Sequence, residues 1–167
     1  MKRKLVNAYM DVAHRFADLS TARRLHVGAI VVKDDRIISI GYNGMPAGWE
    51  NNCEDRVYPD ERAGDYEQHY DEFDAMFPFR DEEDKPYQLK TKPEVLHAES
   101  NAIAKLAKSS ESGLDASLFV THAPCMECAK LIYQSGISSV YYRNSYRDLA
   151  GIDFLRQCGI KIEQLKD

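Results

Sequence analysis

Two short motifs in the chain carry residue types that could do chemistry together. His97 is followed two residues later by Glu99, and Pro124 is followed by Cys125 and then by Cys128. Cysteines three apart at the start of a helix place both thiols on one face, about one turn apart. Two thiolates and one imidazole form a ligand set suited to zinc, and three protein ligands leave one tetrahedral position open for water. We therefore predict that His97, Cys125 and Cys128 bind one catalytic zinc ion.

Glu99 is the residue expected to move protons in such a site. It lies two residues beyond His97 in the same predicted helical turn, so it can reach a metal-bound water without binding the metal. Zinc lowers the pKa of its bound water toward neutrality. Glu99 would accept a proton from that water and deliver it to the substrate that the resulting hydroxide attacks.

Neither motif is specific when taken alone. A single C-x-x-C pair also occurs in redox proteins and in structural zinc sites, and an isolated histidine is more often structural. The start of a helix would favour the thiolate forms of Cys125 and Cys128, which supports metal binding and a redox role alike. Two motifs that open two different helices, with a strand between them, favour the catalytic zinc site.

These motifs require a scaffold that brings them together. Apolar residues at helical spacing predict a helix over 5–19. Two runs rich in β-branched residues predict a hairpin with strands over 27–33 and 36–40. Further along, helices are predicted over 96–108, 125–134 and 149–158, and strands over 118–121, 137–142 and 160–165. This alternation is typical of an α/β fold with several parallel strand pairs in one sheet.

The segment from about 50 to 93 differs in composition from the rest of the chain. It holds about half of the acidic residues, most densely at Asp81–Asp84, together with several aromatic residues. We interpret it as a long, partly helical insertion that packs through its aromatic side chains. Its charges are expected to form a solvated face without chemistry of their own.

Composition limits the class of protein. The chain has 167 residues, enough for one domain with a sizeable core, and its 44% hydrophobic and 29% charged residues are typical of a globular protein. No apolar run is long enough to span a membrane, and the residues after the basic start are too polar for a signal peptide. We therefore expect a cytoplasmic protein. The net charge of −5 disfavours a nucleic-acid polymer as partner.

With these motifs, the run Gly41–Gly48 (GYNGMPAG) resembles the cytidine and deoxycytidylate deaminase superfamily. Within it, the run is most similar to deoxycytidylate (dCMP) deaminases, including phage-encoded members. The resemblance implies one zinc-dependent deaminase domain over residues 1–167, folded as a three-layer α/β/α sandwich with a five-stranded mixed sheet. It also implies hydrolysis of dCMP to dUMP and ammonia, which would supply dUMP for thymidylate synthesis.

The resemblance also assigns roles to individual residues. Asn43 would bind the sugar of the substrate, and further substrate contacts are expected from Ala98, Thr121, Ala123 and Pro124. A regulatory nucleotide site is expected near Gly41, Tyr42, Asn43 and Gly44. Members of the family bind dCTP there as an activator, with Mg²⁺, and dTTP as an inhibitor. Many members are hexamers, so a homo-oligomer is expected.

The phosphate group of the substrate must also meet a partner. Candidates are Arg23 or Arg24, just before the first strand, and Tyr146 or Arg147, after a later strand. Binding sites in open α/β sheets gather at strand ends, which favours Tyr146. We predict that Arg24 and Tyr146 contact the substrate, although a surface charge is the more common role for any single arginine.

Two further features leave questions open. Some phage relatives carry a second, structural zinc, of which Cys53 and His69 could be remnants. The sequence supplies no clear four-ligand set for it, so one zinc is expected. His122 stands where relatives usually have an apolar or small residue, and it could line the substrate pocket or lie in the core.

Three other functions fit part of the pattern. The first is deamination of cytidine, guanine or tRNA adenosine, of which the tRNA reaction is disfavoured by the acidic charge and by Gly41–Gly48. The second is a non-catalytic zinc-binding or nucleotide-sensing module, which an intact Glu99 disfavours. The third is a thiol redox protein using Cys125 and Cys128, which the zinc content of the purified protein would distinguish.

Overall fold

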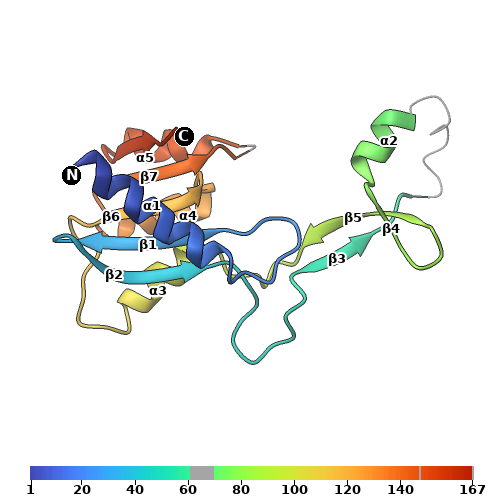
Figure 1. Cartoon of the computed structure of the whole chain (residues 1–167), viewed down its shortest axis with the longest axis horizontal. Coiled ribbons are helices and arrows are strands. Elements are labelled where there is room, and N and C mark those ends of the chain that lie inside the picture. The colour runs from blue at the N-terminus through green and yellow to red at the C-terminus, as the bar shows by residue number, and fades with distance from the viewer. Residues whose placement is uncertain (61–69, 147, 167) are drawn as a thin grey trace.

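A five-stranded sheet forms the centre of the molecule (Figure 1). The computed structural model describes residues 1–60, 70–146 and 148–166. The strand order is β2-β1-β6-β7-β8, in which β1 pairs antiparallel with β2 and β6, whereas β6, β7 and β8 run parallel. The strands are β1 (Gly28–Lys33), β2 (Arg36–Tyr42), β6 (Ser117–His122), β7 (Ser139–Asn144) and β8 (Lys161–Gln164). The mixed five-stranded sheet is therefore confirmed.

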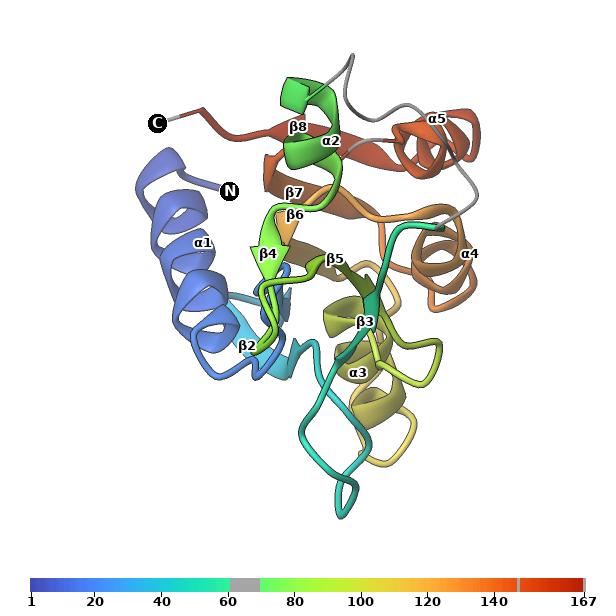
Figure 2. The same cartoon turned by 90° about the vertical axis from the view of Figure 1, so that its right-hand side faces the viewer.

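Helices cover both faces of this sheet, as the two views in Figures 1 and 2 show. One face carries α1 (Arg3–Ala17), and the other carries α3 (Ala98–Leu106), α4 (Met126–Gln134) and α5 (Ala150–Gln157). Successive strand residues point to opposite faces. Ile30 and Val32 pack in the core beneath α1, whereas Ala29 and Val31 pack in the core beneath the other three helices. The three-layer α/β/α sandwich is thus confirmed, and its elements lie within a few residues of the predicted ranges.

The strand directions place two helix starts at the same edge of the sheet. Because β2 and β6 are both antiparallel to β1, their C-terminal ends share one edge. Helix α4 begins just after β6. Helix α3 begins next to the end of β2, where Gly44 and Leu96 exchange two backbone hydrogen bonds of 2.9 and 3.1 Å. The residues at both helix starts therefore meet at this edge.

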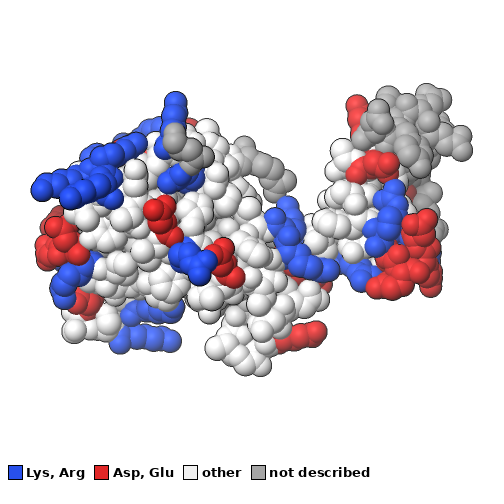
Figure 3. Space-filling model, viewed as in Figure 1, with Lys and Arg blue, Asp and Glu red and all other residues white. Residues whose placement is uncertain are grey.

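Residues 50–93, as far as they are described, form an arm that projects from the body (Figure 1). Its sheet has the order β3-β5-β4, with β3 (Glu54–Val57), β4 (Phe79–Arg80) and β5 (Pro86–Thr91), and a short helix, α2 (Tyr70–Met76), precedes β4. The ring of Tyr87 packs 5.6 Å from Phe79 and 5.9 Å from Tyr58, between ring centroids. Figure 3 shows acidic side chains gathered on the far part of the arm. The sequence pattern did not predict these strands.

The helices that the structure describes are short or amphipathic. None of them combines the length and the apolar character that crossing a membrane requires.

Candidate functional site

Three metal-binding side chains meet where α3 and α4 begin. The Nδ1 atom of His97 lies 3.4 Å from the Sγ atom of Cys128 and 3.6 Å from the Sγ atom of Cys125. Ordinary Zn–N and Zn–S bonds in a tetrahedral site separate nitrogen and sulfur ligands by about 3.6 Å. The three donors are therefore spaced to fit one zinc ion. Within the described ranges, they form the one group of at least three His, Cys, Asp or Glu side chains close enough to hold a metal.

Each of these side chains stands at a helix N-terminus. His97 is the N-cap residue of α3 and Cys125 that of α4, while Cys128 lies in the first turn of α4. The pKa of Cys125 is lowered to about 3 because its sulfur accepts hydrogen bonds from Cys128 and from His97. The same hydrogen bond raises the pKa of Cys128, whose thiol donates it to the sulfur of Cys125. A metal ion that displaces the proton held by this pair would bind both sulfurs.

Glu99 lies next to the cysteines in the first turn of α3. The residue is 4% exposed, and burial raises the pKa of its carboxyl to about 7. The nearby imidazole of His97 opposes this shift. A carboxyl group that titrates near neutrality can both accept and release a proton at neutral pH. The proton-transfer role predicted for Glu99 therefore has a suitable position and environment.

Two glycines allow other elements to approach the metal-binding residues closely. A Cβ atom on Gly41 would lie 2.1 Å from the carbonyl oxygen of Ala98, which is the first residue of α3. A Cβ atom on Gly151, in α5, would lie 2.3 Å from the carbonyl oxygen of Pro124, just before Cys125. Real side chains do not tolerate such distances, so both positions require glycine for packing.

The metal-binding cluster opens onto a pocket with an open mouth. A concave site with a few convergent polar groups is typical of small-molecule binding. The pocket brings together five of the predicted substrate residues with His97, Glu99 and Cys125: Arg24, Asn43, Ala98, Ala123 and Tyr146. Thr121 is buried beside the pocket, where its Oγ1 atom accepts a hydrogen bond from the Gly28 amide. Pro124 packs its carbonyl against Gly151.

The side chain of Asn43 ties together the chain that forms one wall of the pocket. Its Oδ1 atom accepts a hydrogen bond of 2.8 Å from the Val27 amide, and its Nδ2 atom donates one of 2.8 Å to the Leu25 carbonyl. An amide side chain has two donor hydrogens and two acceptor positions, so half of its capacity remains for a ligand. Asn43 thus has a structural role in addition to the predicted contact with the sugar.

The other residues predicted for a regulatory site connect β2 to α3. Tyr42 accepts a hydrogen bond at its carbonyl oxygen from the side chain of Asn101, and Gly44 pairs with Leu96. Gly41 packs against α3. These contacts give the GYNG run a structural task in supporting the helix that carries His97 and Glu99.

The residues predicted as candidates to bind the phosphate lie in different surroundings. Arg24 and Tyr146 line the pocket. The guanidinium of Arg23 instead lies 3.7 Å from the carboxylate of Glu54, and Arg147 lies outside the described residues. His122 also lines the pocket, half-buried, with its Nδ1 atom 3.1 Å from the Thr121 hydroxyl. Burial lowers the pKa of its imidazole. The question left open for His122 is thereby answered in favour of the pocket.

The sequence reasoning missed two pocket residues from the arm, Glu54 and Thr91. Glu54 was not singled out because many acidic residues surround it in this segment. Its neighbour Cys53 offered a signal, because cysteine is usually buried. The Cys53 side chain is fully buried, with its sulfur 3.6 Å from the Thr21 hydroxyl. His69, considered with it as a zinc remnant, lies outside the described residues.

Comparison with known proteins agrees with this geometry. The family model for the cytidine and deoxycytidylate deaminase zinc-binding region matches residues 3–144. The deoxycytidylate deaminase of Enterobacteria phage T4 is 32% identical over 169 residues, which cover 92% of this chain and 86% of the phage protein. ComE operon protein 2 of Bacillus subtilis is 33% identical over 170 residues, which cover 99% of this chain and 74% of that protein.

A solved structure extends the similarity to the whole fold. The dCMP deaminase from the cyanophage S-TIM5, in complex with dCMP and dUMP, superimposes with a TM-score of 0.75. It shares 40% sequence identity, and the match covers 99% of both chains. The arm is therefore included in the similarity. By its family match, its fold and its relatives, this chain belongs to the cytidine and deoxycytidylate deaminase family.

Proposed function

We propose that the chain hydrolyses dCMP to dUMP and ammonia, with one zinc ion bound by His97, Cys125 and Cys128. The observation that carries this proposal is the spacing of the three donor atoms, 3.4–3.6 Å from imidazole to thiol, beside the buried Glu99. The dCMP deaminase names of the phage relatives support the choice of substrate. A zinc ion held by these three residues would activate a water molecule for attack on the pyrimidine.

Glu99 moves the protons of the reaction. It accepts a proton from the attacking water and delivers it to N3 of the cytosine ring, which makes C4 more electrophilic. The water oxygen then forms a bond to C4. Glu99 then takes the proton of the new C4 hydroxyl and delivers it to the 4-amino group. The C4–N4 bond breaks as the C4 carbonyl forms, and ammonia leaves. Burial of Glu99 keeps bulk water from competing as its proton partner.

The remaining pocket residues hold the nucleotide for this chemistry. The small side chains of Ala98 and Ala123 leave room for a flat ring next to Glu99. Asn43 offers its unused amide hydrogen and lone pair to the sugar. Arg24 and Tyr146 are the pocket residues whose side chains suit a phosphate group. Thr121 and Pro124 support the site from behind the pocket wall.

A panel of substrates tests this function. Ammonia release should be fastest from dCMP, compared with deoxycytidine, cytidine, dCTP, guanine and a tRNA containing the target adenosine. Faster release from a free nucleoside or a base would overturn the choice of nucleotide. Disulfide exchange by a zinc-free protein without deamination would favour the redox function instead.

The phosphate contact has its own test, for which the chain offers a matched pair of arginines. Arg24→Ala should raise the KM for dCMP about tenfold or more and leave kcat/KM for deoxycytidine unchanged, because it removes a charged contact with the phosphate. Arg23→Ala, which removes an equal charge from the adjacent position, should have a smaller effect on dCMP. An equal loss on both substrates with Arg24→Ala would contradict the assignment.

The resemblance also supports a regulated homo-oligomer. We propose that dCTP, bound with Mg²⁺, activates the enzyme, that dTTP inhibits it, and that Gly41, Tyr42, Asn43 and Gly44 contribute to this effector site. A hexamer would be the active assembly, in the cytoplasm. Kinetics on dCMP with each triphosphate, and light scattering in the same buffers, test this. A hyperbolic rate curve that neither triphosphate alters would remove the regulatory part.

A further inference from the structure

Glu54 is a buried acidic residue in the arm that the reaction does not use. It begins β3, and the residue is only 2% exposed, although it lies in a segment whose charges were expected to face solvent. It lines the same pocket as Glu99 and Arg24. Burying a carboxylate is costly unless it is paired and hydrogen-bonded, so its contacts indicate its purpose.

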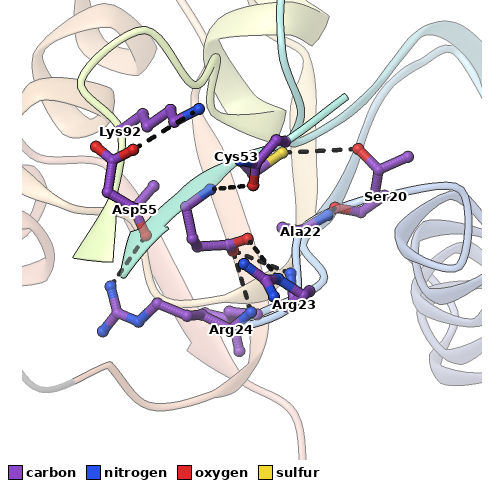
Figure 4. Close-up of polar contacts among 12 residues, drawn as sticks. Ser20, Ala22, Arg23, Arg24, Cys53, Asp55 and Lys92 are labelled. Carbon is purple, nitrogen blue, oxygen red and sulfur yellow. Dashed lines mark hydrogen bonds and ion pairs between the residues drawn. The ribbon is translucent and has the colours of Figure 1, made fainter. Parts of the chain in front are cut away.

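One carboxylate oxygen of Glu54 holds the backbone of two consecutive arginines. Its Oε1 atom accepts hydrogen bonds from the amides of Arg23, at 2.9 Å, and of Arg24, at 3.1 Å. Figure 4 labels the two arginines and marks polar contacts around them with dashed lines. The Oε2 atom accepts no hydrogen bond from the described residues and lies 3.7 Å from Nε of Arg23. Because the two amides share one acceptor, the orientation of the peptide group between them is fixed. This also fixes the direction in which the side chain of Arg24 projects from the backbone.

The guanidinium of Arg24 is held by the residue opposite Glu54 in the arm sheet. Glu54 and Thr91 are directly paired between β3 and β5. The Nη1 atom of Arg24 donates a hydrogen bond of 2.9 Å to the Thr91 hydroxyl, and Thr91 also lines the pocket. This cross-strand pair therefore holds Arg24 at both ends. Glu54 binds its backbone amide, and Thr91 binds its guanidinium.

We infer that Glu54 is a positioning residue that acts through Arg24 on the phosphate of the nucleotide. A free arginine loses considerable rotamer freedom when it binds a ligand, and holding it beforehand reduces that cost. The arm would thus contribute to substrate affinity without touching the pyrimidine. This inference rests on the proposed function, in which Arg24 contacts the phosphate. The alternative is that Glu54 only attaches the arm to the body.

Kinetics of the zinc-loaded enzyme on dCMP and deoxycytidine separate these roles. Glu54→Ala should raise the KM for dCMP about tenfold, with kcat changed less than about twofold and kcat/KM for deoxycytidine unchanged. Glu54→Gln should restore most of the affinity, because its amide oxygen can accept both backbone hydrogen bonds. Thr91→Val should shift the KM for dCMP in the same direction by a smaller factor. Glu83→Ala, an exposed acid on the same arm, serves as control and should leave both substrates unaffected.

A double-mutant cycle provides the sharpest readout. If Glu54 acts through Arg24, Glu54→Ala should add no further loss to Arg24→Ala. The inference would be overturned if Glu54→Ala lowered kcat/KM equally for dCMP and deoxycytidine. It would also be overturned if Glu54→Ala lowered kcat/KM for dCMP by the same factor in the wild-type and Arg24→Ala backgrounds. Either result would leave a purely structural role. If Glu54→Ala fails to fold, an unchanged KM for dCMP in Thr91→Val overturns it. If Arg24→Ala lowered activity equally on dCMP and deoxycytidine, that result would instead overturn the phosphate contact of the proposed function.

Discussion

The Nδ1 atom of His97 lies 3.4 Å from the Sγ atom of Cys128, although 31 residues separate them in the chain. The two atoms meet because α3 and α4 begin at the same edge of the central sheet, where β2 and β6 end. This edge also carries the Gly44–Leu96 pairing that sets the start of α3. The fold thus determines the metal site through two helix starts and not through a continuous loop.

Metal content should depend on each cysteine of this cluster. The purified protein should contain one zinc ion per chain, and Cys125→Ala and Cys128→Ala should each lose it, because two ligands hold zinc far less tightly than three. Elemental analysis of freshly purified protein measures this. Cys158→Ser, at the end of α5, should keep its zinc. Full zinc occupancy in Cys128→Ala would contradict the assignment of ligands.

Gly151 should be essential for the position of Cys125. In Gly151→Ala the new Cβ atom would lie 2.3 Å from the Pro124 carbonyl oxygen, so α5 must move away from the backbone of Pro124 and Cys125. We expect the free energy of unfolding to fall by about 1–3 kcal/mol, with weaker binding of the proposed zinc ion. Urea unfolding and a competitive zinc titration measure the two effects.

A second glycine serves as control for that experiment. A Cβ atom on Gly44 would meet no other atom within 4 Å. Gly44→Ala should therefore change the free energy of unfolding by no more than about 0.5 kcal/mol. Equal destabilisation in the two variants would mean that close packing at Gly151 is not the cause.

Asn43 should prove structural as well as functional. Asn43→Ala removes the two side-chain hydrogen bonds of Asn43, with the Val27 amide and with the Leu25 carbonyl. The expected loss is about 1–3 kcal/mol in the free energy of unfolding, together with a higher KM for dCMP. Asn101→Ala removes one contact, with the Tyr42 carbonyl, and should cost less. Unchanged stability in Asn43→Ala would contradict the structural role and leave only the proposed roles in nucleotide binding.

Hydrophobic periodicity and β-branched runs predicted the elements of an α/β fold, because they report local burial directly. The three layers were predicted from the resemblance to the deaminase family. The sequence also predicted His97, Glu99, Cys125 and Cys128 as a group, because few residue combinations at this spacing suit a catalytic zinc. The strands of the arm were missed because aromatic and acidic residues are mixed there without a clear alternation of period two. Gly151 was missed because a close approach between helices is a tertiary property.

Glu54 and Thr91 illustrate the same limit within the pocket. Neither residue belongs to a motif, and they become partners only when β3 and β5 pair. The hydrogen bond between Arg24 and Thr91 joins residues that are 67 positions apart in the sequence. Chemistry that depends on local spacing was therefore predictable, whereas contacts made through the arm required the structure.

In the proposed reaction, Glu99 transfers protons during deamination of dCMP beside a zinc ion held by His97, Cys125 and Cys128. The most direct test is ammonia release from dCMP by the wild-type protein and by Glu99→Gln, each with its zinc content measured on the same sample. We expect one zinc per chain in both proteins and a kcat lower by about 100-fold to 10,000-fold in Glu99→Gln. A Glu99→Gln protein that retains zinc and deaminates dCMP at the wild-type rate would contradict it.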